Sequence, residues 1–318
     1  MSILPKISKS LDEKTIILTI SKKFNNFIPF FYKFLSQWTI NAYSNFKNIE
    51  TYMILIFLIN KDFIFYRKNG ISVDYKTFFK DKTLEIQKIK ISEISKALNM
   101  PRETVRRKIV YLEKIGVIKR TKQKIFIDRS AYETVQPKET LKRLSKLVSI
   151  SSKILKQENK IHNSFSSEEV SDVVKKNFSF CWYHFYKFIF DYLFTWRKEL
   201  RDFDTVCIGL IILYNASLSE NVIMHDIDIN TWSNRISNAD KTGLNSSSIS
   251  DITGIPRLTV VRKVNSLVDK GFAIQNEKKM ISIKFDQKVF KKTQKIQKKT
   301  IENISQLIFK ILNQASIS

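Results

Sequence analysis

Residues that make tight turns are scarce in this chain, which has six glycines and five prolines among 318 residues. An all-β fold with many tight turns needs more of both, so their scarcity favours helices. Cysteine is scarcer still. Cys181 and Cys207 are too few for a disulfide framework and lack the spacing of metal ligands. Both lie in apolar runs, where a free cysteine behaves as a small hydrophobic residue.

Long apolar runs and catalytic motifs are also missing. The two most apolar segments, 52–59 and 206–213, are far shorter than the roughly 20 residues of a membrane-spanning helix. Residues 1–20 contain no unbroken apolar stretch like a signal-peptide core. A glycine-rich phosphate loop, a Ser/His/Asp grouping and a recognisable carboxylate pair are absent as well. We therefore expect a soluble, cytoplasmic protein that is not an enzyme and has no membrane partner, metal or cofactor.

Acidic residues are outnumbered, with 30 Asp and Glu against 55 Lys and Arg and a formal net charge of +25. A charge of this size favours a polyanionic partner, most often nucleic acid. A second explanation is codon bias, because the chain is rich in Lys, Ile, Asn, Phe and Tyr, which AT-rich codons encode. Acidic residues thin out around one repeated segment, which favours a functional meaning of the charge.

That repeated segment is NMPRETVRRKIVYLEKIGVI at 99–118, which returns as GIPRLTVVRKVNSLVDKGFAI at 254–274. From Pro101 to Gly116, eight of sixteen residues are identical to those 155 positions later. The similarity extends outward: FYKF occurs at 31–34 and 185–188, and KILKQ at 153–157 matches KILNQ at 310–314. Together these matches indicate a duplication of about half the chain.

Each copy is expected to contain the same series of elements. An aromatic-rich helix and a short apolar helix are followed by a polar insertion, two short helices, a β-hairpin and a closing amphipathic helix. The three longer helices are predicted over 24–46 and 178–200, 49–60 and 204–215, and 138–158 and 291–314. The corresponding division is an N-terminal arm (1–23), a first repeat (24–158), a polar linker (159–177) and a second repeat (178–318).

The repeated segment itself reads as helix, tight turn, basic helix, glycine and basic hairpin. A short helix over 91–99 ends in a turn at Asn99, and Pro101 starts the next helix, where its fixed φ is favourable. Gly116 suits a left-handed helix cap, and a hairpin with a basic tip is predicted over 117–128.

This layout resembles the winged helix-turn-helix of bacterial transcription regulators. PRETVRRKIVYLEKIGVI is similar to the recognition segment of Crp-type regulators, and the long flanking helices are similar to the dimerisation helices of MarR-type regulators. The resemblance covers about 40 residues per copy, 88–128 and 243–284. It implies a mainly α fold with small β-hairpin wings, built as two tandem winged helix-turn-helix domains related by pseudo-two-fold symmetry. No cyclic-nucleotide-binding barrel precedes the motif, so no nucleotide effector is implied.

The residue types suit DNA. Arginine can donate two hydrogen bonds to guanine, glutamate can accept from cytosine, and a helix start can hold a phosphate. In the first copy the expected DNA-binding residues are Ser92, Arg102, Glu103, Thr104, Arg106, Arg107, Arg120, Lys122 and Lys124. In the second copy they are Arg257, Leu258, Thr259, Val261, Arg262, Lys263, Lys278 and Lys279.

The second copy departs from the first where the helix would face the groove. Glu103 is replaced by Leu258, and Arg106 by Val261. The aliphatic side chains could touch thymine methyl groups, or they could mark a copy that binds protein or binds DNA weakly. We expect a different base preference, and therefore two unequal half-sites.

A tandem chain places two DNA-reading helices together without a second subunit, so we expect a monomer with an internal pseudo-dimer. The aromatic stretches 24–38 and 178–196 are expected to face each other, although a pocket for a small apolar effector is an alternative use. The predicted function is sequence-specific binding of double-stranded DNA by a transcription regulator. The alternatives are a plasmid-type replication initiator with tandem winged helices and a protein-interaction scaffold that does not bind DNA.

Overall fold

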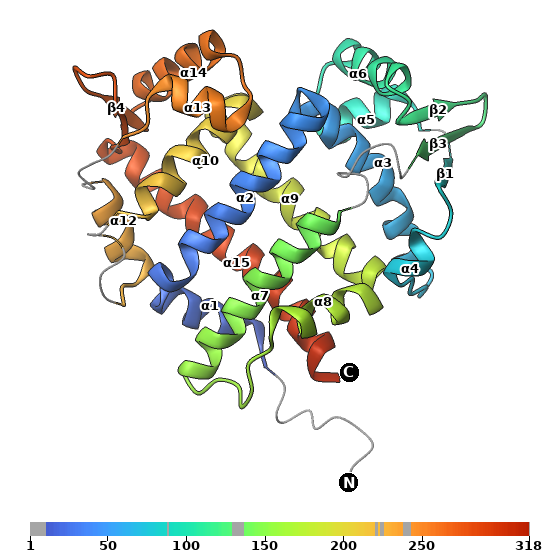
Figure 1. Cartoon of the computed structure of the whole chain (residues 1–318), viewed down its shortest axis with the longest axis horizontal. Helices are drawn as coiled ribbons and strands as arrows, with labels where there is room; N and C mark the ends of the chain where they lie inside the picture. Colours follow the sequence, from blue (N-terminus) through green and yellow to red (C-terminus); the bar gives the residue numbers. More distant parts are fainter. Residues whose placement is uncertain are drawn as a thin grey trace.

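Two aromatic-rich helices cross the middle of the molecule, α2 (Phe24–Phe46) and α9 (Phe178–Leu200) (Figure 1). The computed structural model describes residues 11–87, 89–128, 137–219, 222, 226–237 and 243–317. In that part the protein is mainly helical with two small antiparallel sheets, which confirms the expected fold class at this level.

The expected helices and hairpin occur in the expected order in both halves. Up to the middle of the chain the remaining elements are α1 (Glu13–Lys22), α3 (Ile49–Lys68), α4 (Tyr75–Phe78), β1 (Thr83–Gln87), α5 (Ile91–Leu98), α6 (Arg102–Lys114), β2 (Ile118–Arg120), β3 (Lys124–Asp128) and α7 (Lys138–Gln157). Beyond it come α8 (Ser167–Lys176), α10 (Phe203–Ser217), α12 (Ile229–Ser237), α13 (Ser246–Thr253), α14 (Arg257–Asp269), β4 (Ala273–Gln275), β5 (Ile281–Ile283) and α15 (Gln287–Ile317). Of these, α1, α4, β1, α8 and α12 are additional to the expected series.

Two helices form where an arm and a linker are expected. The Asp12 side chain accepts a hydrogen bond from the Thr15 amide at the start of α1, at 2.7 Å. Helix α8 begins with a capping box, in which Ser166 and Glu169 satisfy each other's backbone amides. Such caps fix a helix start in otherwise polar sequence, and both helices then pack against α7 and α15.

The aromatic stretches pack on each other, as expected. The Phe31 ring lies 6.1 Å from the rings of both Phe188 and Tyr192, and the Phe34 ring lies 6.0 Å from that of Phe185. Edge-to-face ring pairs at these distances add to the stabilisation from apolar burial. The seam between the halves is therefore part of the hydrophobic core rather than a surface contact.

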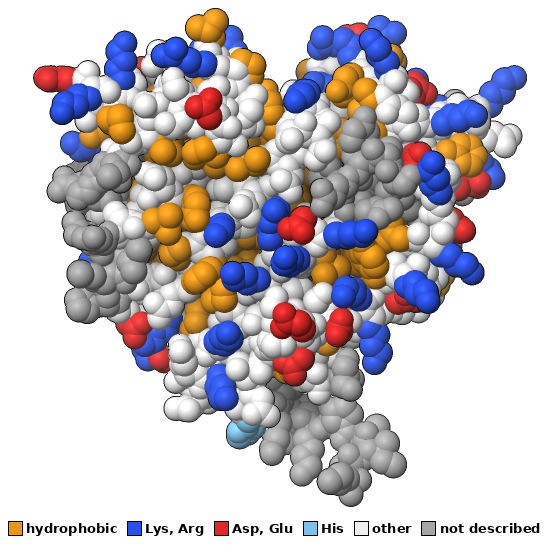
Figure 2. All heavy atoms as spheres, viewed as in Figure 1, with side chains coloured by type: hydrophobic (Ala, Val, Ile, Leu, Met, Phe, Trp, Pro, Cys, Tyr) orange, Lys and Arg blue, Asp and Glu red, His pale blue; other side chains and the backbone are white. Residues whose placement is uncertain are grey.

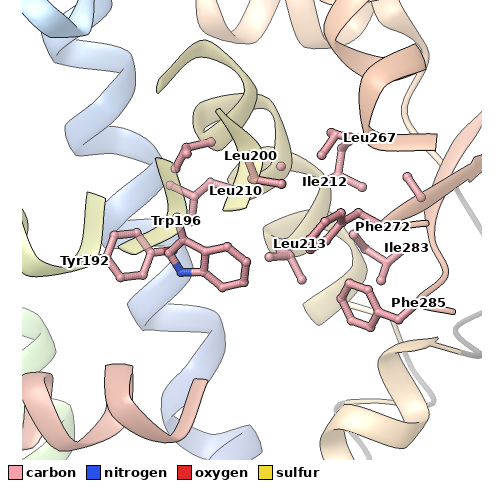
Figure 3. A pocket seen from close by; sticks show the side chains of 13 residues that line it. Tyr192, Trp196, Leu200, Leu210, Ile212, Leu213, Leu267, Phe272, Ile283 and Phe285 are labelled. Carbon is pink, nitrogen blue, oxygen red and sulfur yellow. The ribbon is translucent and has the colours of Figure 1, made fainter. Parts of the chain in front are cut away.

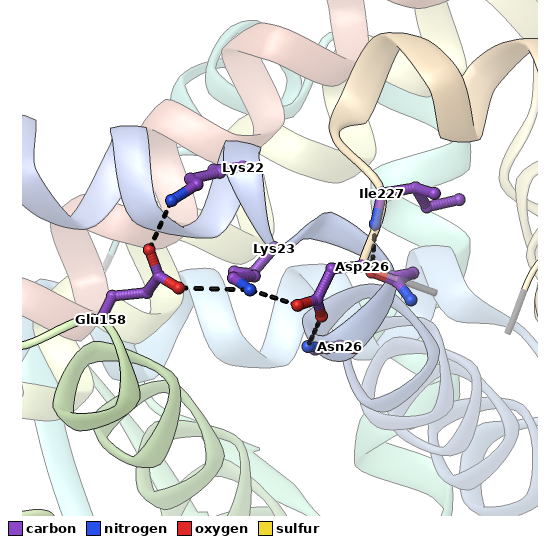
Figure 4. A network of polar contacts seen from close by, with 7 residues as sticks. Lys22, Lys23, Asn26, Glu158, Asp226 and Ile227 are labelled. Atoms are coloured by element: carbon purple, nitrogen blue, oxygen red, sulfur yellow. Dashed lines mark hydrogen bonds and ion pairs between the residues drawn. The ribbon is translucent and has the colours of Figure 1, made fainter. Parts of the chain in front are cut away.

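The halves are also interlocked. Helix α2 packs on α10 of the second half, and α3 packs on α9. Near the start of α2, Glu158 at the end of α7 pairs with Lys22 at 2.7 Å and with Lys23 at 3.2 Å (Figure 4). Lys23 also pairs with Asp226 of the second half, so this network joins three distant segments of the chain.

The two sheets differ. In the first half the expected hairpin, β2 and β3, gains β1 as a third strand, giving the antiparallel order β1-β3-β2. In the second half β4 pairs with β5, and a single bridge from Leu244 to Ile281 stands beside them. Among the helices that the structure describes, none has both the length and the apolar character needed to cross a bilayer.

Candidate nucleic-acid interface

The turns that precede α6 and α14 have the same construction. Asn99 and Gly254, 155 positions apart, both adopt left-handed backbone conformations, with φ of 46° and 72°. The Ser95 hydroxyl donates to the Met100 carbonyl at 2.6 Å, and the Ser250 hydroxyl donates to the Ile255 carbonyl at 2.7 Å. The two turns therefore share the same hydrogen bond and the same left-handed position.

The ends of α6 and α14 also match. Gly116 and Gly271 have φ of 75° and 72°, and their amides donate to the carbonyls of Glu113 and Val268. The next amides, of Val117 and Phe272, reach back to residues 112 and 267 at 3.0 and 2.9 Å. This pair of bonds is a Schellman cap, which directs the chain from the helix into the hairpin.

One face of each helix is buried and the opposite face is open. The buried positions are equivalent in the two helices: Val105, Ile109 and Leu112 in α6, and Val260, Val264 and Leu267 in α14. Figure 1 shows α6 and α14 on the same side of the molecule, with their hairpins pointing outward in opposite directions. Figure 2 shows lysine and arginine side chains on that side and over the rest of the visible face, with hydrophobic side chains among them.

The open face of α6 carries most of the expected charges. Arg102 and Arg107 are exposed, and Thr104 is half-buried. The Arg106 guanidinium donates to both carboxylate oxygens of Glu103, at 2.9 and 3.0 Å, and this contact lowers the pKa of Glu103. Because the pair is exposed, it is weak. Each of the two side chains can therefore leave this contact to bind another polar group.

The hairpin of the first half places its expected residues differently. Arg120 is directed away from the hairpin tip and donates to both oxygens of Glu113, at 2.8 and 2.6 Å. Lys124 pairs with Glu85 of β1 at 2.5 Å, and Lys122 is exposed in the turn. Arg120 therefore braces α6 against the sheet, a role that the sequence did not indicate.

The open face of α14 is more apolar than that of α6. The Leu258 residue is 85% exposed and Val261 is 39% exposed, while Arg257 and Arg262 beside them are also exposed. Thr259 is half-buried. At this exposure the Leu258 side chain packs little against the described residues.

The remaining expected residues divide by exposure. Lys278 and Lys279 are exposed in the turn between β4 and β5. Ser92 is half-buried in the first turn of α5. Lys263 is directed toward the start of α10, where its ammonium lies 2.7 Å from the Asp202 carboxylate.

Lys263 belongs to a charge cluster between the two helix pairs. Lys108, at the equivalent position of α6, lies 4.0 Å from Glu50. Burial raises the pKa of Asp204, the neighbouring carboxylates of Asp202 and Glu50 raise it further, and the two lysines oppose this. The cluster therefore holds a partly desolvated carboxylate between the two halves.

A small apolar cavity of about 30 Å³ lies behind the second helix pair, among α9, α10, α14 and the β4–β5 hairpin. Figure 3 shows Trp196 and Tyr192 pointing toward it, opposite Phe272 and Phe285. Ligand pockets generally occupy about 300–1,000 Å³, so this cavity is too small for an effector. No cluster of three or more metal-ligating side chains occurs in the described residues.

No family model, curated protein or solved structure matches the chain.

Proposed function

We propose that the chain is a sequence-specific double-stranded DNA-binding protein, a transcription regulator built as two tandem winged helix-turn-helix domains related by pseudo-two-fold symmetry. The observation that carries the proposal is the placement of α6 and α14 on one side of the molecule, each with a matched turn, a matched cap and two exposed arginines at equivalent positions. In this assignment α6 and α14 are the recognition helices, and the β2–β3 and β4–β5 turns are the wings.

The charges support roles that differ between residues. Arg102, Arg107, Arg257 and Arg262 are exposed on the recognition helices and can reach base edges or phosphates. Lys122, Lys278 and Lys279 lie in the wing turns, where they suit phosphate contacts. Arg120 is paired with Glu113 of α6, and Lys263 is paired with Asp202 at the start of α10, so these two residues orient the helices rather than read the DNA.

The two recognition helices would read different bases. An exposed leucine and valine on α14 suit the methyl groups of thymine, whereas α6 presents arginine and glutamate, which suit G·C pairs. A single chain would therefore bind an asymmetric site made of two unequal half-sites about one helical turn apart.

Selection of bound duplexes from a random pool, followed by fluorescence anisotropy, tests the proposal. We expect an enriched sequence that survives competition by bulk DNA, with an affinity that falls as salt rises. Arg107→Ala should remove the base preference in one half-site and weaken specific binding by roughly 1–3 kcal/mol per lost bidentate contact. Lys114→Ala, at the far end of the same helix, is the matched control and should leave the preference unchanged.

Arg262→Ala, at the position equivalent to Arg107, should act on the other half-site. Equal binding to all duplexes would contradict a sequence-specific regulator. If no duplex binds at all, a protein-interaction scaffold explains the chain better. If the binding sites cluster beside a replication origin, a replication initiator does.

A further inference from the structure

A surface groove of about 260 Å³ lies between α2 and α7, away from the recognition helices. Figure 2 shows lysine and arginine side chains mixed with hydrophobic ones over the middle of the molecule, where α2 and α7 run side by side in Figure 1. The DNA-binding proposal gives this groove no role.

One wall of the groove is strongly basic. Lys142, Arg143 and Lys146 project from adjacent turns of α7, and Lys33 faces them from α2. Glu139 is the single acidic residue of the lining and lies 3.5 Å from one guanidinium nitrogen of Arg143. The other terminal nitrogen of Arg143 is buried and has no hydrogen-bond partner among the described residues. A buried donor of this kind is costly to leave unpaired.

The floor of the groove is apolar. Phe30 is 41% exposed, and Phe34, Leu147 and Ile150 complete the lining beneath the charged rim. The groove therefore places an exposed aromatic ring beside several cations. An occupant with both an acidic group and an apolar part would cover both features.

The second half contains the equivalent groove, between α9 and α15, in a closed form. Its volume is about 10 Å³. Lys187 and Phe188 correspond to Lys33 and Phe34, but His184, Asp191 and Asn303 stand where the first half has Phe30, Gln37 and Lys146. The open, basic form is therefore specific to the first half and is not a necessary result of how these helices pack.

We infer that the α2–α7 groove binds a small amphiphilic carboxylate. The carboxylate is held by the exposed ammonium groups of Lys33 and Lys146 at the rim, beside Arg143, and its alkyl chain covers Phe30 and Ile150. The inference is independent of DNA binding, because it rests on residues outside the recognition helices and wings.

Calorimetric titration of the full chain with decanoate tests the inference. We expect saturable binding at one site, with at least a tenfold weaker affinity for decanol, which lacks the charge, and for acetate, which lacks the chain. The double variant Lys33→Ala, Lys146→Ala should weaken decanoate binding at least tenfold. Both lysines are exposed, so the fold should be retained, as an unchanged thermal unfolding curve would show.

Two further variants separate the head group from the tail and the first half from the second. Phe30→Ser should weaken decanoate binding without affecting acetate. Lys187→Ala, in the closed groove, should leave binding unchanged. Equal affinity for decanoate and decanol, or an unaltered affinity in the double lysine variant, would overturn the inference.

Discussion

Arg197 in α9 donates hydrogen bonds to the backbone carbonyls of Leu98 and Asn99, at the end of α5 in the other half of the chain. Its guanidinium also lies 5.0 Å from the centre of the Phe203 ring. The last carbonyls of a helix lack intrahelical partners, and a cation there satisfies them and interacts favourably with the helix dipole. The turn before α6 is thus held by a residue of the opposite half.

Arg197→Ala should lower the free energy of unfolding by about 1–2 kcal/mol, because charge-assisted hydrogen bonds to the turn are lost. If α6 reads DNA, specific affinity should fall as well, since the angle of the helix is no longer fixed. Urea unfolding and anisotropy measure the two effects. The neighbouring exposed residue supplies the control: Lys198→Ala should change neither quantity.

The two glycines that cap α6 and α14 should differ in their tolerance of alanine. Gly116 has open space around its Cα, so Gly116→Ala should cost about 1 kcal/mol from the left-handed backbone alone. A Cβ at Gly271 would collide with the side chain of Asp286, which caps α15 by accepting from the Val289 amide at 2.7 Å. Gly271→Ala should therefore cost about 1 kcal/mol more. Equal urea midpoints for the two variants would contradict this account.

Gly209→Ala should stabilise the protein. Gly209 lies inside α10 beside the small apolar cavity, and an added Cβ would meet the Leu200 side chain at an ordinary 3.8 Å. Alanine is better than glycine in a helix by roughly 0.5–1 kcal/mol. Gly243→Ala is the opposite case, because its Cβ would lie 2.6 Å from the Ile281 carbonyl oxygen. The midpoint temperature of thermal unfolding should rise for Gly209→Ala and fall for Gly243→Ala.

Asp204→Asn should stabilise the protein at neutral pH and change its pH dependence. Burial is the largest cause of the raised pKa of Asp204, which means that the folded state disfavours the charged form. The wild-type protein is therefore more stable with this carboxyl protonated, and it loses that stability as pH rises from the unfolded pKa of about 3.9 through the folded pKa. Urea unfolding should give the variant a higher free energy of unfolding than the wild type at pH 7, and the difference should be smaller at pH 4. A stability difference that grows toward acid pH would show that burial does not disfavour the charged form of Asp204.

The sequence predicted the long aromatic helices well. The expected limits of 24–46 and 178–200 coincide with α2 and α9, because dense apolar periodicity and the internal repeat define them twice. Helix α3 runs to Lys68 instead of ending at residue 60, because residues 61–68 contain no glycine or proline that would end the helix. Strand β1 is not among the expected elements, although Leu84 and Ile86 alternate as a strand requires, because it is short and lies between the polar insertion and the first short helix.

The site was predictable only in part. Exposure of Arg107 and Leu258 follows from the helical period, since each lies opposite a buried stripe. Arg120 pairs with Glu113, and Lys263 pairs with Asp202. Both contacts depend on how separate elements pack together, which the spacing of residues along the chain does not reveal. Arg197 was missed for the same reason, because its partners lie 98 and 99 positions away.

The pairing of α2 with α10 and of α3 with α9 has a consequence for the history of the chain. A half separated from the other would leave one face of its aromatic helix exposed, and a second copy of the same half could cover that face. If the two halves arose by duplication, a single-copy ancestor would therefore have been most stable as an intertwined homodimer.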